Sequence, residues 1–579
     1  MELVFDIEAN GFLFEADTIW CIVAIDEHDK VYSFGPNKIN EGIKLLQTAD
    51  KIIGHNIIGY DIPLIKKLYN IDLYDTNKVI DTLILSRLAN PVREGGHSLE
   101  KWGYRLGGTQ KQEHDDWTQF SQDMLNRCKK DTIINKTLFN YLKKEFLGFT
   151  KECILLEHET TQVLQQQYEN GFLFDEKEAM FLLSSLNKRK SEVEKEVHET
   201  FKPKWIAIKT ITPKLKKDGL LSKSGLTEYE YEEIKASGNM KPFVRKQLRE
   251  FNLGSRQQIG EYLQDFGWKP NKFTPTGQPI VDETTLNKVK HIREAKLIAE
   301  FLLLQKRSAQ VSSWIDALKG DGRVHGSVIC TGAITGRMAH RSPNMAQVPA
   351  FYNPYGKECR SCWIVPEGYK LVGVDASGLE LRMLAHYMAD EDYINEIING
   401  DIHTANQNFA GLKSRDEAKT FIYALIYGAG DAKIGSIING NREAGRKLRE
   451  RFLSSLPALA TLKSRVERAA EKKYLKGIDG RKLLLRHKHA SLNTLLQGSG
   501  AILMKKGLTI LDSLLKLNTI DYKFVANIHD EWQIEVKETQ AEFVGELAVN
   551  SIIEAGKHFN LRCPMDGEYK IGDNWSETH

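Results

Sequence analysis

The stretch from Leu371 to Met388, LVGVDASGLELRMLAHYM, constrains the fold more than any other part of the chain. It opens with a short apolar run typical of a buried strand, and this run ends at Asp375. Small residues at 376–378 indicate a turn, and the apolar spacing that follows predicts a helix. A carboxylate beside a backbone carbonyl at a strand end can hold a hard divalent cation against a phosphate. Taken alone, the stretch is equally well a β-turn-α unit with a capping acid.

Composition limits the classes of protein to which the chain can belong. Its 579 residues are too many for one core, so about two to four domains are expected. The net charge of +3 argues against a uniformly basic coat, so any polyanion would bind to local patches. Seven scattered cysteines suit a reducing cytoplasm. Neither a secretion leader nor a membrane-spanning run is expected.

Four carboxylates in the first part of the chain suggest a metal site. Asp6 and Glu8 lie at i and i+2 of a predicted strand, so both side chains point to one face. Asp61 follows a glycine-bearing segment, and Asp131 lies in a predicted helix. Such a group repels itself unless cations neutralise it, and two bound metals could activate water against a phosphodiester. Each acid alone is more often a solvated or capping residue.

A regular row of side chains marks the segment RDEAKTFIYALIYGAG. Arg415, Lys419, Tyr423 and Tyr427 recur every four residues, so on a helix they form one stripe. Two cations followed by two aromatic rings suit a nucleotide, with the cations on phosphates and the rings against sugar and base. An exposed amphipathic face could also show such a row.

Two later segments add further polar residues. The run FVANIHDEWQIEV predicts two strands with the acids of residues 529–531 at the tip, which would be costly without a cation. Asn493 and Gln497, at i and i+4, share one face of a predicted helix. Arg337, in the turn TGRMAHRSPN, could reach minor-groove acceptors, which test the shape of a base pair without reading its sequence.

The order of these motifs resembles that of DNA polymerase family A (DNA polymerase I-like), nearest to the replicative polymerases of short-tailed bacteriophages. The resemblance covers nearly the whole chain. It implies an α+β multidomain fold in which an RNase H-like 3′–5′ exonuclease domain precedes a right-hand polymerase with palm, thumb and fingers. The implied boundaries are 1–145 for the exonuclease and 146–579 for the polymerase, with the thumb at about 185–310, the fingers at about 391–475, and the palm at about 146–184, 311–390 and 476–579.

The resemblance implies a DNA-templated DNA polymerase that extends a primer 3′-OH with dNTPs, has a proofreading exonuclease, and serves phage genome replication. Two Mg²⁺ ions are implied at each site, and Mn²⁺ could replace them. The implied metal ligands are Asp375, Ala376 and Asp530 at the polymerase site, and Asp6, Glu8, Asp61 and Asp131 at the exonuclease site. Lys419 would donate a proton and Glu531 would support the polymerase site. The implied dNTP-binding residues are Arg415, Lys419, Tyr423, His403, Glu380, Ala376, Ser377, Gly378 and Leu379. The implied DNA-binding residues are Arg337, Tyr427, Asn493, Gln497 and His529.

Two positions refine the implied activities. Glu380 matches the sugar gate of the family, which occupies the place of a ribose 2′-OH and so rejects ribonucleotides. Arg127 stands four residues before Asp131, where the family has a tyrosine that orients the attacking water. Whether this arginine weakens the exonuclease is left open by the sequence.

The implied partners are primer-template DNA, dNTPs, and the helicase-primase and single-strand binding protein of a replisome. The chain is expected to be a monomer in the cytoplasm, that of the host if a phage encodes it. Residues 201–224 are rich in lysine, which fits either sequence-independent phosphate contacts or a solvated loop. This segment is short for a thioredoxin-recruiting insertion, so such a processivity factor is not expected, although the resemblance leaves it open.

Three alternatives compete with this interpretation. A single-subunit RNA polymerase shares the palm acids, but that class has glycine in place of Glu380 and lacks the exonuclease domain. A non-catalytic primer-template binding factor with relic motifs is disfavoured by the intact acids. The third alternative keeps only the nuclease activity.

Overall fold

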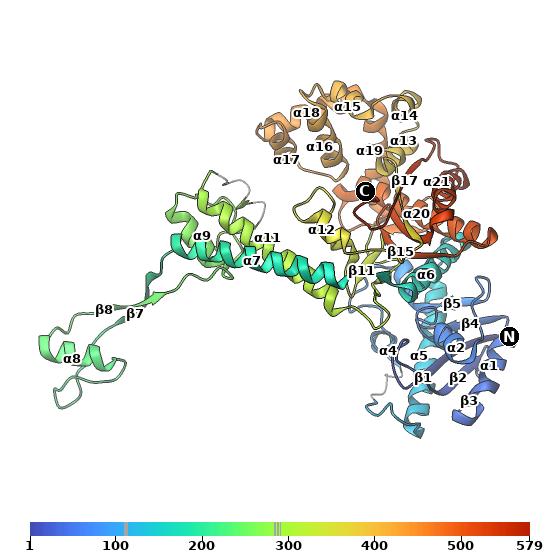
Figure 1. Ribbon diagram of the computed structural model, residues 1–579, viewed down its shortest axis with the longest axis horizontal. Coiled ribbons are helices and arrows are strands. Elements are labelled where there is room, and N and C mark those ends of the chain that lie inside the picture. Colours follow the sequence, from blue (N-terminus) through green and yellow to red (C-terminus); the bar gives the residue numbers. More distant parts are fainter. Residues whose placement is uncertain (109–113, 283–284, 287–288, 290) are drawn as a thin grey trace. The chain divides into compact units, whose positions relative to one another are not determined.

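The computed structural model describes residues 1–108, 114–282, 285–286, 289 and 291–579 (Figure 1). The chain forms two compact units. One combines Met1–Asp175 with Ala317–His579, and the other is Glu176–Asp316. The finer domain boundaries inferred from the sequence stay predictions.

A five-stranded mixed sheet with strand order β3-β2-β1-β4-β5 lies near the N-terminus. Its strands are β1 (Glu2–Ala9), β2 (Ile19–Asp26), β3 (Val31–Phe34), β4 (Lys51–Gly54) and β5 (Val79–Asp81). Strand β1 is antiparallel to β2 and parallel to β4. Because side chains alternate along β1, Phe5 enters one apolar cluster and Val4 another. Asp6 and Glu8 therefore share the face of Val4.

Helices cover both faces of this sheet. They are α1 (Ile39–Thr48), α2 (Asp61–Tyr69), α3 (Thr82–Ala89), α4 (Leu99–Leu106) and α5 (Gln122–Glu145). Ile43 of α1 and Ile65 of α2 pack in the cluster of Phe5, whereas Leu138 of α5 packs in the cluster of Val4. Helix α5 thus lies on the face that carries Asp6 and Glu8.

The C-terminal part contains a four-stranded antiparallel sheet with strand order β15-β16-β12-β17. Its strands are β12 (Tyr369–Ala376), β15 (Tyr522–Ile528), β16 (Glu531–Lys537) and β17 (Gly567–Gly572). The predicted strand, turn and helix at residues 371–388 are confirmed, because β12 is followed by α13 (Leu379–Met388). Gly378 makes the turn with a φ of 59°, a backbone conformation that glycine adopts without strain.

The other elements of this unit connect and surround the second sheet. Those before α13 are α6 (Lys151–Asn170), β6 (Phe172–Leu173), β9 (Arg323–Val324), β10 (Ser327–Ile329), β11 (Ala339–Arg341) and α12 (Gly356–Ser361). A helical group follows α13, made of α14 (Glu391–Asn399), α15 (Ile402–Ala410), α16 (Arg415–Ile426), α17 (Asp431–Ile437), α18 (Arg442–Ser455) and α19 (Pro457–Ala469). The chain then forms the hairpin β13 (Tyr474–Lys476) and β14 (Lys482–Leu484), and the helices α20 (Ser491–Leu517) and α21 (Ala541–His558).

The second unit is built on two long helices, α7 (Glu176–Thr200) and α11 (Arg293–Asp316), which pack side by side. Between them in the chain lie β7 (Lys204–Ile211), α8 (Glu228–Ser237), β8 (Phe243–Arg249) and α9 (Arg256–Asp265). The solvated loop considered for residues 201–224 is wrong for the first part of the segment, because β7 pairs with β8 there. Acids also balance part of its charge, as Lys204 pairs with Asp265 and Lys223 with Glu228.

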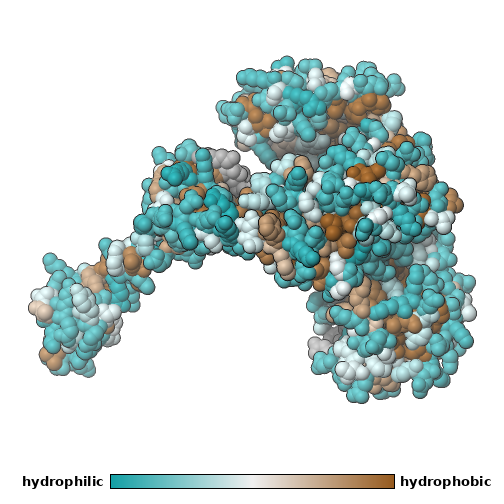
Figure 2. All heavy atoms as spheres, viewed as in Figure 1, coloured by the Kyte–Doolittle hydropathy of each residue, from teal (hydrophilic) through white to brown (hydrophobic). Residues whose placement is uncertain are grey.

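The surface in Figure 2 is mostly hydrophilic, and its apolar residues lie in scattered patches. Among the helices that the structure describes, none combines the length and the apolar character that a membrane crossing requires.

A buried ionic network joins α6 to the β13–β14 hairpin and to α20. Glu157 on α6 is fully buried and accepts hydrogen bonds from Lys505 Nζ at 2.7 Å and from Arg481. Arg481 also bonds Asp479 through Nε at 2.8 Å. Burial alone would raise the pKa of Glu157, but Lys505 and Arg481 hold it well below its ordinary value. The two cations and two acids therefore neutralise one another inside the protein.

The network predicts a large cost for removing one partner. In Glu157→Gln, two cations would share a single buried acid, which should destabilise the fold by about 3–5 kcal/mol. A lower midpoint of thermal unfolding would show this. The matched control is Glu443→Gln, which loses only an exposed pair with Arg446 and should change stability by less than about 0.5 kcal/mol. Equal midpoints for the two variants would contradict the account.

Candidate active sites

The strand end singled out by the sequence meets the tip of the hairpin formed by β15 and β16. The amide N–H of Ala376 donates a hydrogen bond to the carbonyl oxygen of Asp530 at 3.1 Å. This bond joins the residue after Asp375 to Asp530 itself, so the two acids lie at one edge of the sheet. His529 at the hairpin tip has a φ of 59°, which is uncommon outside glycine and concentrates at functional sites.

Carboxylates surround Asp375. In the strand register it lies opposite Glu531 on β16 and opposite Glu568 on β17. Burial, and after it the Asp530 carboxylate, raises the pKa of Asp375 to about 7. Burial also raises the pKa of Asp530. Since the acidic neighbours all disfavour the charged form of Asp375, the donor set fits a divalent cation that prefers oxygen ligands.

Glu568 is a member of this row that the sequence analysis missed. It stands in the short edge strand GEYKIG, where a lone exposed acid has no distinguishing pattern. Only the pairing of β17 with β12 brings it to Asp375.

Glu531 is tied into the packing behind the row. Its Oε1 accepts hydrogen bonds from Gln533 Nε2 and from Trp575 Nε1, both at 2.6 Å. His579 Nε2 lies 3.3 Å from its Oε2. These contacts hold the carboxylate in place and connect β16 to the C-terminal residues, which is the geometry expected of a supporting group.

The predicted stripe lies on α16, apart from Tyr427, which caps the end of that helix. Ser414 and Glu417 form a capping box, which fixes the start of the helix at Arg415. Lys419 is exposed. The rings of Tyr423 and Tyr427 lie 6.2 Å apart, so both aromatic residues share one side of the helix.

Two residues expected to bind phosphate have specific neighbours. Arg415 donates from Nε and Nη2 to both carboxylate oxygens of Asp401, at 2.6 and 3.2 Å, a pairing that the sequence did not indicate. His403 lies 6.4 Å from the ring of Tyr423. Burial, followed by the charges of Arg415 and Lys419, lowers the pKa of His403.

Glu380 connects Arg337, which precedes β12 in the chain, to Tyr427 at the end of α16. It is 9% exposed and accepts hydrogen bonds from Arg337 Nη2 at 3.0 Å and from the Tyr427 hydroxyl at 2.7 Å. A candidate sugar gate, a candidate minor-groove arginine and the last ring of the stripe therefore form one network. The sequence proposed all three residues separately but gave no signal of their pairing.

Some of the remaining predicted positions lie close to Asp530. A cavity of about 20 Å³ is lined in part by Arg337, Leu379, His529 and Asp530. Ser377 donates its amide N–H to the Asp566 carbonyl, which fixes the turn before α13. Asn493 and Gln497 lie on α20 one turn apart.

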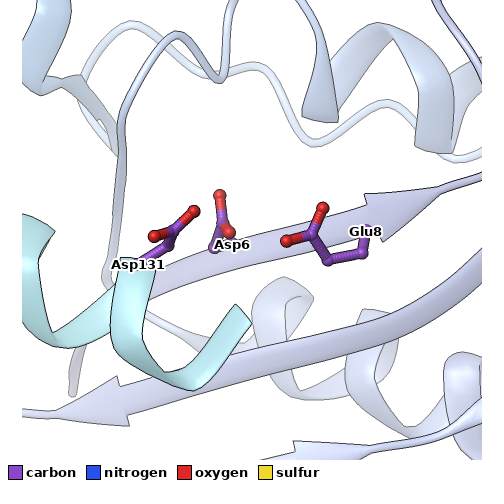
Figure 3. A group of neighbouring side chains, drawn as sticks. All are labelled: Asp6, Glu8 and Asp131. Carbon is purple, nitrogen blue, oxygen red and sulfur yellow. The ribbon is translucent and has the colours of Figure 1, made fainter. Parts of the chain in front are cut away.

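The second group of acids lies on the N-terminal sheet. Asp6 and Glu8 from β1 and Asp131 from α5 bring one carboxylate oxygen each to within 4.8 Å of one another (Figure 3). This spacing fits a hard divalent cation held by carboxylates. Asp61 lies outside this trio, at the start of α2, and burial raises its pKa to about 8. The structure therefore brings three of the four predicted acids together.

Arg127 contacts this group directly. Its Nε donates to Glu8 Oε1 at 3.0 Å, and its guanidinium lies over the ring of Trp117 at 4.9 Å from the centroid. Both side chains of the ion pair are largely buried, with 14% and 10% of their area exposed. The position at which the family has a tyrosine thus supplies a fixed positive charge to one of the three acids.

Comparisons with known proteins agree with this architecture. The family model described as DNA polymerase family A matches residues 226–577. The chain therefore belongs to DNA polymerase family A.

Particular relatives are similar over their whole length. The DNA-directed DNA polymerases of Enterobacteria phage T3 and Escherichia phage T7 are each 33% identical to this chain, with 100% of both chains covered. DNA polymerase I of Pseudomonas aeruginosa is 28% identical over 57% of this chain and 39% of its own length. A solved structure, the POL domain of Pol1 from M. smegmatis in complex with DNA primer-template and dNTP, shares the fold. Its TM-score is 0.78 at 16% identity, covering 100% of this chain and 95% of that one.

Proposed function

We propose that the chain is a DNA-templated DNA polymerase that extends a primer 3′-OH with dNTPs by two-metal phosphoryl transfer. The observation that carries the proposal is the junction of Asp375 and Asp530, made by the Ala376 to Asp530 backbone hydrogen bond. The identity to phage DNA-directed DNA polymerases supports it. By that likeness, the activity would serve replication of a phage genome in the host cytoplasm.

Asp375, Asp530 and the Ala376 carbonyl would hold two Mg²⁺ ions. When bound, these ions lower the pKa of the primer hydroxyl and neutralise the triphosphate and the leaving pyrophosphate. The protein contributes the fixed positions of its ligands, since the hairpin tip that carries Asp530 is bonded to β12. The supporting Glu531 is held by Gln533, Trp575 and His579. Such fixed ligands need no reorganisation when the reaction begins.

Helix α16 would bind the incoming nucleotide. Exposed Lys419 would contact the triphosphate and donate the proton to the leaving group, while the Tyr423 ring would lie against sugar or base. Arg415 is held by Asp401, so a phosphate would compete with that carboxylate or share the guanidinium with it. His403, which lies beside Tyr423, would also contact the triphosphate.

The second set of residues would test the base pair and the sugar. Arg337, His529, Asn493 and Gln497 would contact the primer-template, the first through minor-groove acceptors common to correct pairs. Glu380, fixed by Arg337 and Tyr427, would occupy the place of a ribose 2′-OH. A buried glutamate that accepts two hydrogen bonds at this position disfavours an RNA polymerase function.

The N-terminal part would be an RNase H-like 3′–5′ exonuclease that removes mismatched primer ends. Two observations support this. The sheet has the order β3-β2-β1-β4-β5 with β2 antiparallel to β1, and Asp6, Glu8 and Asp131 form the carboxylate trio. Asp6, Glu8 and Asp131 would hold a divalent cation, and Asp61 is the further carboxylate proposed for this site. Monomeric action with helicase-primase and single-strand binding protein remains part of the proposal.

The sugar-gate role predicts a change in substrate choice. In Glu380→Ala, the space for a 2′-OH opens, and the ratio of kcat/KM for NTP to that for dNTP should rise roughly 5- to 150-fold. That range corresponds to the about 1–3 kcal/mol cost of an unsatisfied buried hydroxyl. Single-nucleotide extension kinetics measure it. Glu391→Ala, at an exposed helix start, is the control and should leave the ratio unchanged. A rise that is equal in both variants would contradict the role.

The two sites predict separable losses. Asp530→Ala should reduce primer extension about 100-fold or more and leave digestion of a single strand intact. The double change Asp6→Ala with Glu8→Ala should do the reverse. Both reactions can be followed on labelled primers in gels. If either variant, still folded by circular dichroism, lost both activities, the assignment of two sites would be wrong.

The ion pair of Arg127 with Glu8 predicts a lowered exonuclease rate. Its ion pair with Glu8 opposes binding of a cation by that carboxylate, so Arg127→Tyr should digest a mismatched primer end faster and need less Mg²⁺ for half-maximal rate. The control is Lys129→Gln, two residues further along α5, which among the described residues forms no ion pair with the trio. An unchanged Mg²⁺ requirement in Arg127→Tyr would show that the arginine does not restrain the site.

A further inference from the structure

Asp401 contacts both segments that are proposed to hold the triphosphate. It precedes α15 and accepts hydrogen bonds from the backbone N–H groups of His403 and Thr404, at 3.0 and 3.4 Å. The Thr404 hydroxyl donates a further bond to it at 3.0 Å. An aspartate in this position caps the helix, because it satisfies N–H groups that have no partner within the helix. The cap therefore fixes the direction of the Asp401 carboxylate.

The same carboxylate holds Arg415 at the start of α16. Both oxygens take part, since Oδ2 accepts from Nε at 2.6 Å and Oδ1 accepts from Nη2 at 3.2 Å. Bidentate pairing is the strong form of an arginine–carboxylate contact, and arginine binds phosphate with the same geometry. The side chains are 51% and 42% exposed, so a dissolved phosphate can reach the pair.

Asp401 also lies among the other cations proposed to bind phosphate. The charges of Arg415 and Lys419 lower the pKa of His403 after burial has done so, whereas the charge of Asp401 raises it. Each of the three charged groups is thus close enough to act on His403. Among the residues that the structure describes, Asp401 is the only carboxylate within ion-pair distance of Arg415.

A carboxylate in this position opposes every phosphate that binds to Arg415. If the phosphate replaces the carboxylate, Asp401 loses its partner, and if both share the guanidinium, two negative charges lie side by side. Two unit charges about 4 Å apart in water repel each other enough to change an affinity roughly fivefold. A dNTP is also held by its base and sugar, whereas pyrophosphate is held through its charges alone. The opposition therefore matters most when pyrophosphate leaves.

We propose that Asp401 promotes release of the pyrophosphate product by taking Arg415 back from it. The proposal rests on the proposed polymerase function, because that reaction supplies the pyrophosphate. No covalent bond changes in this step. The Nε and Nη2 donors of Arg415 exchange phosphate oxygens for the two carboxylate oxygens of Asp401. Asp401 is thus a positioning residue that acts through Arg415.

The variant Asp401→Asn tests the charge and keeps the cap, because asparagine is among the best capping residues. Inorganic pyrophosphate is added to single-nucleotide primer extension in Mg²⁺, and the concentration that halves the rate is measured. We expect half-inhibition of Asp401→Asn at a pyrophosphate concentration roughly fivefold below that of the wild type. The KM for dNTP should fall as well, while the first-turnover rate at saturating dNTP, measured by rapid quench, stays within about twofold. A purely structural role of Asp401 predicts the opposite sign, since a displaced Arg415 would bind pyrophosphate more weakly.

The matched control is Asp416→Asn, which removes the same charge from an exposed neighbour. Asp416 acts on the pKa of Arg415 after Asp401 does, but among the described residues it forms no ion pair with this arginine. Its half-inhibiting concentration should stay within about twofold of the wild type. Equal shifts in the two variants, or unchanged or weaker inhibition of Asp401→Asn, would overturn the proposal.

Direct binding separates this proposal from the one on which it rests. Inorganic pyrophosphate with Mg²⁺ is titrated into the full-length wild type and into Asp401→Asn by calorimetry. Tighter binding by the variant, with no primer extension by the wild type, would refute the polymerase function and keep the competition for Arg415. Extension by the wild type, with equal pyrophosphate binding by both proteins, would refute the role of Asp401 alone.

Discussion

The candidate polymerase site depends on a group of carboxylates that repel one another and that the backbone holds together. Asp375 lies between Glu531 and Glu568 across the strands of one sheet, and the Ala376 to Asp530 hydrogen bond adds a further acid at the same edge. Burial and the acidic neighbours raise the pKa of Asp375 to about 7, because both disfavour its charged form. Strand pairing holds these acids together, so the site is formed before any metal or nucleotide arrives.

Other buried carboxylates of the same unit are paired with cations or hydrogen-bond donors. Glu157 gathers two buried cations where α6, the β13–β14 hairpin and α20 meet. Glu380 holds Arg337 and Tyr427 together on the side that we propose binds the nucleotide. The N-terminal site differs, since Arg127 already gives Glu8 a cation. Carboxylates thus cluster at both sites, and at the N-terminal site an arginine is paired with one of them.

The sequence predicted much of this because its strongest signals are local. The alternating run of β1, the strand and helix around Asp375, the hairpin at 529–531 and the four-residue stripe of α16 each carry their own period. What it missed depends on contacts between distant segments. Glu568 has no motif, and Arg415 gives no sign that Asp401 will hold it. The strand β7 was missed because its alternation is exposed on most positions and its lysines resemble a solvated loop. Asp61 could be named from sequence, but its distance from the trio is set by where α2 begins.

The account is tested most directly by one reaction of the unmodified protein with a primer-template that ends in a single mismatch. The primer is labelled at its 5′ end, and products are resolved with Mg²⁺ and dNTPs present and again with a chelator. The account predicts shortening of the primer by removal of the mismatched nucleotide, followed by full extension, and neither reaction in the chelator. Failure to extend a matched primer in Mg²⁺, or extension that persists in the chelator, would contradict it.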